Sequence, residues 1–419
     1  MNRWNRVIVV IVTLLALAGL WQGIRAFIEP GGEEMIAQSA QQTKPTELPS
    51  APALSPQPVD PTVPPDEVSL PTWLASHARD WKTDWSKKTI DFTELLAGGP
   101  PRDGIPSIDQ PTYETYDEAS EWLASNEPVL VINLNQEAVA YPLQILLWHE
   151  IVNDVVGGVP VAVTYCPLCN SAVVFERTID GRVTEFGVSG LLRHSDLVMY
   201  DRYSESLWQQ LTGEGIVGAH AGSELEIVPS SIVSFADFAA FPDGLVLSRN
   251  TGYGRPYGRT PYRGYDEVGS SPFLFDGVVD ERLAAVERVV TVSLEQGDFA
   301  YPYALLNKKG VIHDQPEGRD LVVFHLPGTA SALDEVIISE AKDVGATGVF
   351  NPFVDGQKLT FSQGDGVLID DQTGSEWNIF GMSIAGELQG KQLELVTHGD
   401  HFWFAWAAYK PDTIVYSDS

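Results

Sequence analysis

The hydrophobic and polar positions of the chain fall mainly into short runs that are typical of β-strands. Segments 159–165 (VPVAVTY) and 321–325 (LVVFH) are rich in β-branched and aromatic residues and are bounded by Gly, Pro and Asp, which favours strands. Apolar residues at helical spacing predict only short helices, at 115–125, 142–148, 234–241 and 301–307. Strands do not alternate with helices as in βαβ units. We therefore expect a mainly β fold with short helices, of the β-rich α+β class.

One uncharged apolar run stands near the N-terminus, at residues 7–24 between two arginines. A membrane span needs about 17–25 such residues, so we expect residues 1–29 to form a membrane anchor. A cleaved signal peptide is the alternative. Residues 30–70, rich in Pro, Ser, Gln and Glu, predict a disordered stalk. The basic residues before the run predict a single-pass cell-membrane protein with its bulk extracytoplasmic, or a secreted protein if the segment is cleaved.

The remainder of the chain contains an internal repeat. Residues 134–167 align without a gap with residues 294–327, at a shift of 160 positions. Ten of the 34 aligned positions are identical, namely Leu134, Gln136, Ala140, Tyr141, Pro142, Leu146, Asp154, Gly158, Val163 and Pro167. Asp201 and Trp208 also recur, as Asp370 and Trp377. We expect two homologous repeats packed together, repeat 1 at 71–265 and repeat 2 at 266–419.

Charge and cysteine content narrow the range of functions. The 419 residues include 26 Lys+Arg and 57 Asp+Glu, which gives a formal net charge of −31. Nucleic acids are bound through clustered Lys and Arg, so we expect no nucleic-acid partner. The only cysteines, Cys166 and Cys169, are too few to stabilise a chain of this length by disulfides. Export would place them in an oxidising compartment, and any role that they have is local.

A predicted β-hairpin brings a histidine close to this cysteine pair. Gly157-Gly158, between two apolar runs, is typical of a two-residue turn, and facing residue numbers then add up to 315. Pro160 falls at a pair where its missing N–H costs nothing. His149 faces Cys166 across a pair whose Cβ atoms lie about 4.5–5.5 Å apart.

Three functions fit a histidine beside a Cys-x-x-Cys motif. The leading hypothesis is a metal site for copper or zinc, formed by Cys166, Cys169 and His149. Supporting candidates for this site are Glu150, Asp154, Met199 and His194. The second hypothesis is a thiol–disulfide redox pair, and the third is a non-catalytic binding or scaffold module with a structural cysteine pair. These motifs do not decide whether the protein is an enzyme.

Repeat 2 lacks the candidate ligands. The residues that replace His149, Glu150, Cys166 and Cys169 at the shift of 160 are Lys309, Gly310, Leu326 and Thr329. A shared fold without the cysteines favours a local function for them in repeat 1. The arginine-rich segment 249–263 is expected to be a solvated loop that joins the repeats, with an anion-binding loop as the alternative.

Several motifs together resemble those of the domain-of-unknown-function 3179 family. They are 98–106 (GGPPRDGIP), 140–143 (AYPL), 149–154 (HEIVND), 164–169 (TYCPLC), 186–190 (FGVSG), 197–202 (LVMYDR), 206–208 (SLW), 402–406 (FWFAW) and 411–413 (PDT). The resemblance covers about residues 85–416. It implies an exported prokaryotic protein, often behind a signal peptide or anchor, and it implies no established activity.

Overall fold

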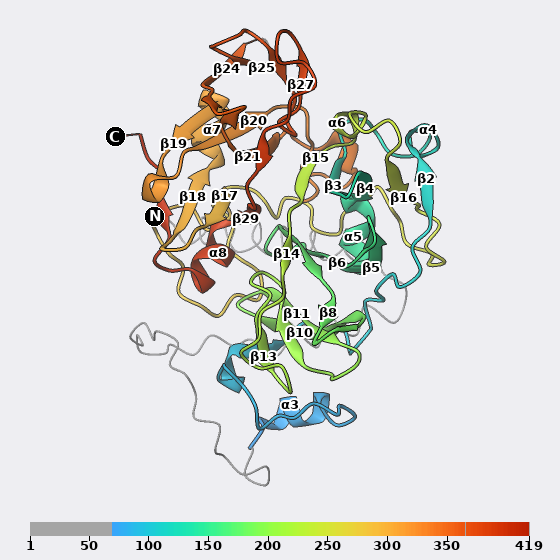
Figure 1. The fold of residues 1–419 in the computed structure, drawn as a ribbon. Helices are drawn as coiled ribbons and strands as arrows, with labels where there is room; N and C mark the ends of the chain where they lie inside the picture. The colour runs from blue at the N-terminus through green and yellow to red at the C-terminus, as the bar shows by residue number, and fades with distance from the viewer. Residues whose placement is uncertain (1–68, 365, 419) are drawn as a thin grey trace, which may run out of the picture.

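The computed structural model describes residues 69–364 and 366–418, in which strands predominate and helices are short (Figure 1). The expected mainly β class is therefore confirmed. The expected anchor at 1–29 and nearly all of the stalk at 30–70 lie outside the described residues. In the part that is described, no helix is long and apolar enough to cross a membrane.

The first group of strands forms three sheets. One has the order β15 (Ser231–Ser234), β3 (Pro128–Leu134), β4 (Glu137–Pro142), β16 (Leu245–Leu247) and β2 (Tyr113–Thr115). The next has the order β14 (Ile227–Val228), β7 (Ser171–Glu176), β6 (Val159–Cys166) and β5 (Ile151–Val156). The last has the order β1 (Leu95–Ala97), β10 (Phe186–Arg193), β11 (Asp196–Asp201), β12 (Leu207–Gln209) and β13 (Gly215–Val217). A small hairpin joins β8 (Thr178–Ile179) to β9 (Arg182–Val183).

The second group has the same strand orders, except that among the described residues it has no counterpart of the edge strands β1 and β2. Its first sheet has the order β29 (Gly399–Phe402), β17 (Arg288–Ser293), β18 (Asp298–Pro302) and β30 (Ile414–Val415). Its second sheet has the order β28 (Glu394–Leu395), β21 (Ala346–Asn351), β20 (Leu321–Leu326) and β19 (Val311–Asp314). Its third sheet has the order β24 (Phe361–Gly364), β25 (Val367–Asp370), β26 (Glu376–Trp377) and β27 (Ser383–Ala385). The small hairpin is β22 (Phe353–Val354) with β23 (Gln357–Lys358). Each group has one parallel pair at the same place, β4 with β16 and β18 with β30.

The two groups contact each other reciprocally. Strand β29 of the second group packs against β7 of the first, and β15 of the first packs against β21 of the second. Because β29 and β15 hold the same place in their sheets, as do β7 and β21, the junction uses the same surfaces twice, as an isologous interface does. The sheet with β10 and β11 and the sheet with β24 and β25 lie at opposite ends of the molecule (Figure 1).

Short helices follow several of these strands. Helices α5 (Leu143–His149) and α7 (Tyr303–Lys309) confirm two predicted helices. The other two predictions were too long, because only the turns α4 (Tyr116–Ala119) and α6 (Phe235–Phe238) form, each with a capping box. Helices that the pattern did not predict are α3 (Thr72–His77), α8 (Trp403–Tyr409) and the 3-10 turns Phe92–Glu94, Pro316–Gly318 and Ile338–Glu340.

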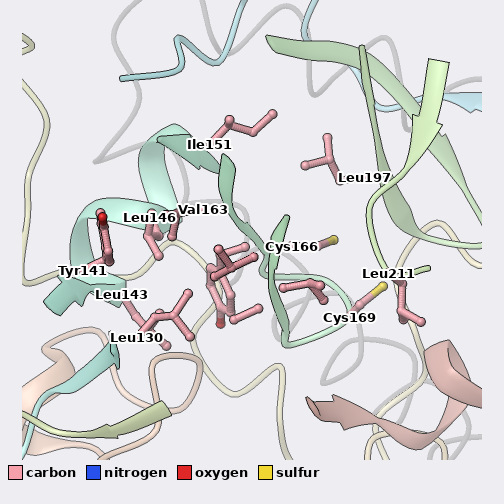
Figure 2. Packing of buried hydrophobic residues seen from close by; sticks show 14 of the residues in the cluster. Leu130, Tyr141, Leu143, Leu146, Ile151, Val163, Cys166, Cys169, Leu197 and Leu211 are labelled. Atoms are coloured by element: carbon pink, nitrogen blue, oxygen red, sulfur yellow. The ribbon is translucent and has the colours of Figure 1, made fainter. Parts of the chain in front are cut away.

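The largest hydrophobic cluster lies across the junction of the two groups. It contains Cys166 and Cys169 from the first group together with Phe402, Trp403 and Trp406 from the second. Figure 2 shows that the two sulfur atoms point to the same side of the chain, toward Leu211. The cysteine pair is therefore part of the core, at the place where the two groups meet.

A buried carboxyl group holds α5 in place behind this core. Glu127, which is 5% exposed, accepts hydrogen bonds from the Ala124 amide (3.2 Å) and from Gln144 Nε2 on α5 (2.7 Å). Burial raises the pKa of Glu127 to about 7. The protonated carboxyl is the form that the fold favours.

This pKa predicts a loss of stability toward neutral pH. Because the folded pKa lies above the ordinary value of 4.5, the folded state binds the proton more tightly than the unfolded state. The free energy of unfolding should therefore fall by about 3 kcal/mol as pH rises from 4.5 to above 7. Glu127→Gln, which stays neutral, should lack this part of the fall in urea unfolding measured across that range. A variant curve parallel to that of the wild type would contradict the prediction.

Candidate metal site

The hairpin of β5 and β6 has the predicted register. Gly157 and Gly158 form the turn with positive φ values of 56° and 81°, as a turn with two left-handed residues requires. The facing pairs run from Val156–Val159 to Ile151–Thr164, so their numbers add up to 315. The prediction from the Gly-Gly turn is confirmed over the whole length of β5.

The extension of this register to a pair between His149 and Cys166 is wrong. His149 is the last residue of α5, and β5 begins only at Ile151. Glu150 between them has a left-handed backbone with φ 57°, and its N–H donates to the Leu146 carbonyl (2.8 Å) to close the helix. Residues 143–149 therefore form helix α5 and do not extend strand β5.

Both ring nitrogens of His149 are engaged elsewhere. Nδ1 donates to the Pro106 carbonyl (2.7 Å), which leaves Nε2 to accept from the Tyr257 hydroxyl (2.6 Å). Burial lowers the pKa of His149 to about 4, although the bond to Pro106 opposes this shift. The imidazole is neutral at physiological pH and does not lie in the group formed by the two cysteines.

An aspartate takes the place expected for the histidine. The two thiol sulfurs and one carboxylate oxygen of Asp196 all lie within 4.8 Å of one another, and all three residues are buried. The Cys166 thiol also donates to the Ser195 carbonyl (3.8 Å). Among the described residues, this is the one group of three or more His, Cys, Asp or Glu side chains that could hold a metal ion.

Two turns from different sheets build this group. Cys166 ends β6, and Cys169 lies in the turn before β7, where its carbonyl accepts from the Phe402 amide of the second group (2.9 Å). Asp196 begins β11, directly after the turn 194–195 that closes the hairpin of β10 and β11. Both turn residues have positive φ, 49° and 70°, without glycine. No sequence motif marks Asp196, because the contact depends on the packing of two sheets.

Each carboxylate oxygen of Asp196 has a different environment. Oδ2 accepts from Gln209 Nε2 (2.5 Å) and from the Leu211 amide (3.0 Å). Oδ1 is buried and accepts no hydrogen bond from a nitrogen or oxygen donor, whereas hydrogen bonds from the Cys166 and Cys169 thiols lower the pKa of this carboxyl. A metal ion bound here would take the place of the thiol protons.

The titratable side chains at and beside this group are all acids, namely Asp196, Glu150 and the two thiols. Burial raises the pKa of Asp196 to about 6 and that of Glu150 to about 8, and it raises the pKa values of both thiols. These raised pKa values favour the protonated, neutral forms of the thiols and of Glu150. A bound metal ion would stabilise the deprotonated forms, since coordinating thiols lose their protons.

The remaining candidates lie outside the group. Asp154 accepts hydrogen bonds from the hydroxyls of Tyr113 and Tyr141, and its counterpart Asp314 accepts from Tyr301 (3.0 Å). Its recurrence in the repeat was therefore a sign of a structural role. The other two candidates are His194, which contacts Asp276 (3.2 Å) and Glu94 (3.7 Å), and Met199, which packs in the core opposite Val188 and Trp208.

Placing Glu150 close to the group costs free energy of folding. A left-handed backbone costs a residue with a Cβ about 1–2 kcal/mol, and the second group has Gly310 at the corresponding helix end, with φ 69°. Burial of the Glu150 side chain, which is 8% exposed, raises the pKa of its carboxyl to about 8. Both features oppose folding, which is typical of a residue kept for function.

Glu150→Gly is accordingly expected to stabilise the protein. Glycine removes the backbone strain and the desolvated carboxyl, so the free energy of unfolding should rise by about 1 kcal/mol or more. The matched control is Gly310→Ala, which should destabilise the protein because a Cβ there would lie 1.8 Å from Gln363 Oε1. Denaturant unfolding measures both. A less stable Glu150→Gly protein would mean that the carboxyl supports the fold.

Comparison with known proteins gives a family without an assigned activity. A family model described as "Protein of unknown function (DUF3179)" matches residues 102–413. No curated protein and no solved structure matches the chain. Because the matched region spans well over half of the chain and includes Cys166, Cys169 and Asp196, the chain belongs to the DUF3179 family of proteins of unknown function.

Proposed function

We propose that the protein binds a zinc ion through Cys166, Cys169 and Asp196. The observation that carries this proposal is the convergence of the three ligand atoms within 4.8 Å in the buried junction of two strand groups. The buried Oδ1 of Asp196, which accepts no hydrogen bond from a nitrogen or oxygen donor, supports it. Three protein ligands leave one position of a tetrahedral ion open, as in zinc sites that exchange a water or substrate molecule.

The donor set favours zinc over copper. Copper(I) prefers thiolate, thioether and imidazole ligands, whereas zinc also accepts a carboxylate oxygen. The imidazole of His149, which would have suited copper, is occupied by Pro106 and Tyr257. Two sulfurs and one carboxylate oxygen are therefore better matched to zinc.

The redox hypothesis has less support. Cys166 is 2% exposed and Cys169 is 0% exposed, so a protein reductant has no access to either sulfur. Thiols that exchange disulfides are accessible and have lowered pKa values, whereas burial raises the pKa values of both thiols here. A purely structural pair is also disfavoured, because Leu326 and Thr329 stand in its place in the second group.

The proposal also includes the cellular location of the protein and the evolutionary origin of its two strand groups. The uncharged run at 7–24 supports a single-pass membrane anchor with the site outside the cytoplasm. The matching strand orders support an origin of the two groups by duplication, with the site acquired or retained by the first group alone.

Metal analysis of the full-length protein, purified under reducing conditions, tests the zinc site. The wild type should hold one zinc ion per chain, and Cys166→Ser/Cys169→Ser should hold almost none. Asp196→Asn should weaken zinc binding by more than about tenfold, the loss that an outer-shell change already causes.

The control is Thr329→Ala, at the position that corresponds to Cys169, which should keep its zinc. Circular dichroism of each variant confirms that it is folded. Equal and near-zero metal in the wild type and the double variant would refute the zinc proposal.

A further inference from the structure

A polar pocket of about 270 Å³ lies between the small hairpin of β8 and β9 and the sheet that contains β11 and β13. Its lining includes Asp180 and Arg182 of the hairpin, Asp201 at the end of β11, Tyr203 and His220. This sheet lies at one end of the molecule (Figure 1). None of the three metal-site residues lines the pocket, so any ligand that it binds is separate from the zinc ion.

The two carboxylates of the lining belong to the frame that recurs in both groups. Asp201 accepts a hydrogen bond from a buried tryptophan (3.1 Å), and Asp370 does the same in the second group (3.0 Å). Asp180 begins the turn between β8 and β9 with a φ of 50°, and Asp355 begins the turn between β22 and β23 with the same φ. The presence of both aspartates is therefore explained by the fold.

Three charged or aromatic side chains of the lining are specific to the first group. They are Arg182, Tyr203 and His220, and the residues at the corresponding places of the second group are Gln357, Gln372 and Leu388. Arg182 and Gln357 hold the same position in their hairpins. The amides of His220 and Leu388 each donate to a serine hydroxyl (3.2 and 2.9 Å). Because the second group forms the same frame without them, these three side chains have a function in the pocket itself.

Contacts with aromatic rings hold two of these side chains in place. The Arg182 guanidinium carbon lies 4.0 Å from the centre of the Tyr203 ring, which is 64% exposed. A guanidinium above a ring keeps N–H groups for other partners. The His220 ring stacks on Trp208 at 5.7 Å, and its Nδ1 lies 3.8 Å from Asp180 Oδ2. The pocket thus combines aromatic surface with a hydrogen-bond donor and a hydrogen-bond acceptor.

Charge and size restrict the ligand. A small anion would meet the carboxylates of Asp180 and Asp201, and a small cation would meet the guanidinium of Arg182, so a neutral ligand is favoured. Pockets for drug-sized molecules measure about 300–1,000 Å³, and this pocket is slightly smaller. A neutral sugar ring fits these limits. Its hydroxyls both donate and accept, which suits a carboxylate and a guanidinium together, and its C–H face packs on aromatic rings.

We propose that this pocket binds one neutral sugar ring. Arg182 donates to its hydroxyls and Asp180 accepts from them, while the rings of Tyr203 and His220 contact its C–H face. The pocket is a second site, and its function does not depend on the zinc site.

Saturation-transfer NMR tests this binding on the full-length protein, in a buffer free of sugar-based detergents. Glucose, galactose, mannose and N-acetylglucosamine are offered one at a time, and at least one should receive saturation at its ring C–H protons. Glycerol, which has hydroxyl groups but no ring, should receive none. Arg182→Gln/His220→Leu introduces the residues of the second group, so the hairpin should still form. This double variant should bind the sugar about tenfold more weakly, because it loses a hydrogen bond and an aromatic contact.

The matched control is Gln357→Ala, at the position of the second group that corresponds to Arg182, which should bind the sugar as the wild type does. Circular dichroism checks that both variants are folded. No saturation of any of the four sugars would overturn the proposal, as would equal affinity in the wild type and the double variant. Equal saturation of glycerol and the sugars would overturn the ring contact. Each of these results leaves the zinc site standing, because zinc content is measured separately.

Discussion

Burial of the cysteine turn depends on the reciprocal packing of two edge strands, β29 against β7 and β15 against β21. The hydrogen bond from the Phe402 amide to the Cys169 carbonyl fixes one end of this junction directly on the Cys-x-x-Cys turn. Because the turn lies inside the largest hydrophobic cluster, its thiols lose contact with water. The chemistry of the site follows from this exclusion, since burial is the first cause of the raised pKa values of both thiols and of Asp196.

A second constraint recurs in both groups and explains why the fold tolerates an acidic site. Trp208 donates to Asp201 (3.1 Å), and Trp377 donates to Asp370 (3.0 Å). These buried bonds hold equivalent sheets without help from the cysteines. The first group therefore has a frame that is independent of its site, and local changes at Glu150 or Asp196 leave that frame intact.

The sequence predicted the features that depend on local rules. The Gly157-Gly158 turn gave the register of β5 and β6, because a two-residue turn allows only one pairing. The Tyr-Pro pairs marked the two helices that follow β4 and β18. These predictions rest on residues close together in the chain.

The features that could not be predicted from the sequence depend on contacts between residues that are far apart in the chain. Asp196 reaches the cysteines only because a hairpin of another sheet folds over their turn. His149 was misplaced because the hairpin rule was extended past Ile151, where the helix already controls the backbone. The site role of Asp154 was overestimated although its recurrence as Asp314 indicated a shared structural bond with a tyrosine. Comparing the two aligned segments residue by residue would have removed Asp154 from the candidates but not His149, because Lys309 replaces His149 in the second segment.

The segment 248–287, named the strap because it connects β16 to β17 without a helix or strand, has a consequence for the dynamics of the molecule. It contributes no strand to the eight sheets, and its only ladder-type contact among the described residues is the bridge between Arg259 and Ile337. Its detachment is a local opening with its own free energy, smaller than that of global unfolding. Amide hydrogens along the strap would then exchange with solvent independently of those in the sheets, and the lifetime of a bound ion would be set by this opening rather than by the stability of the protein as a whole.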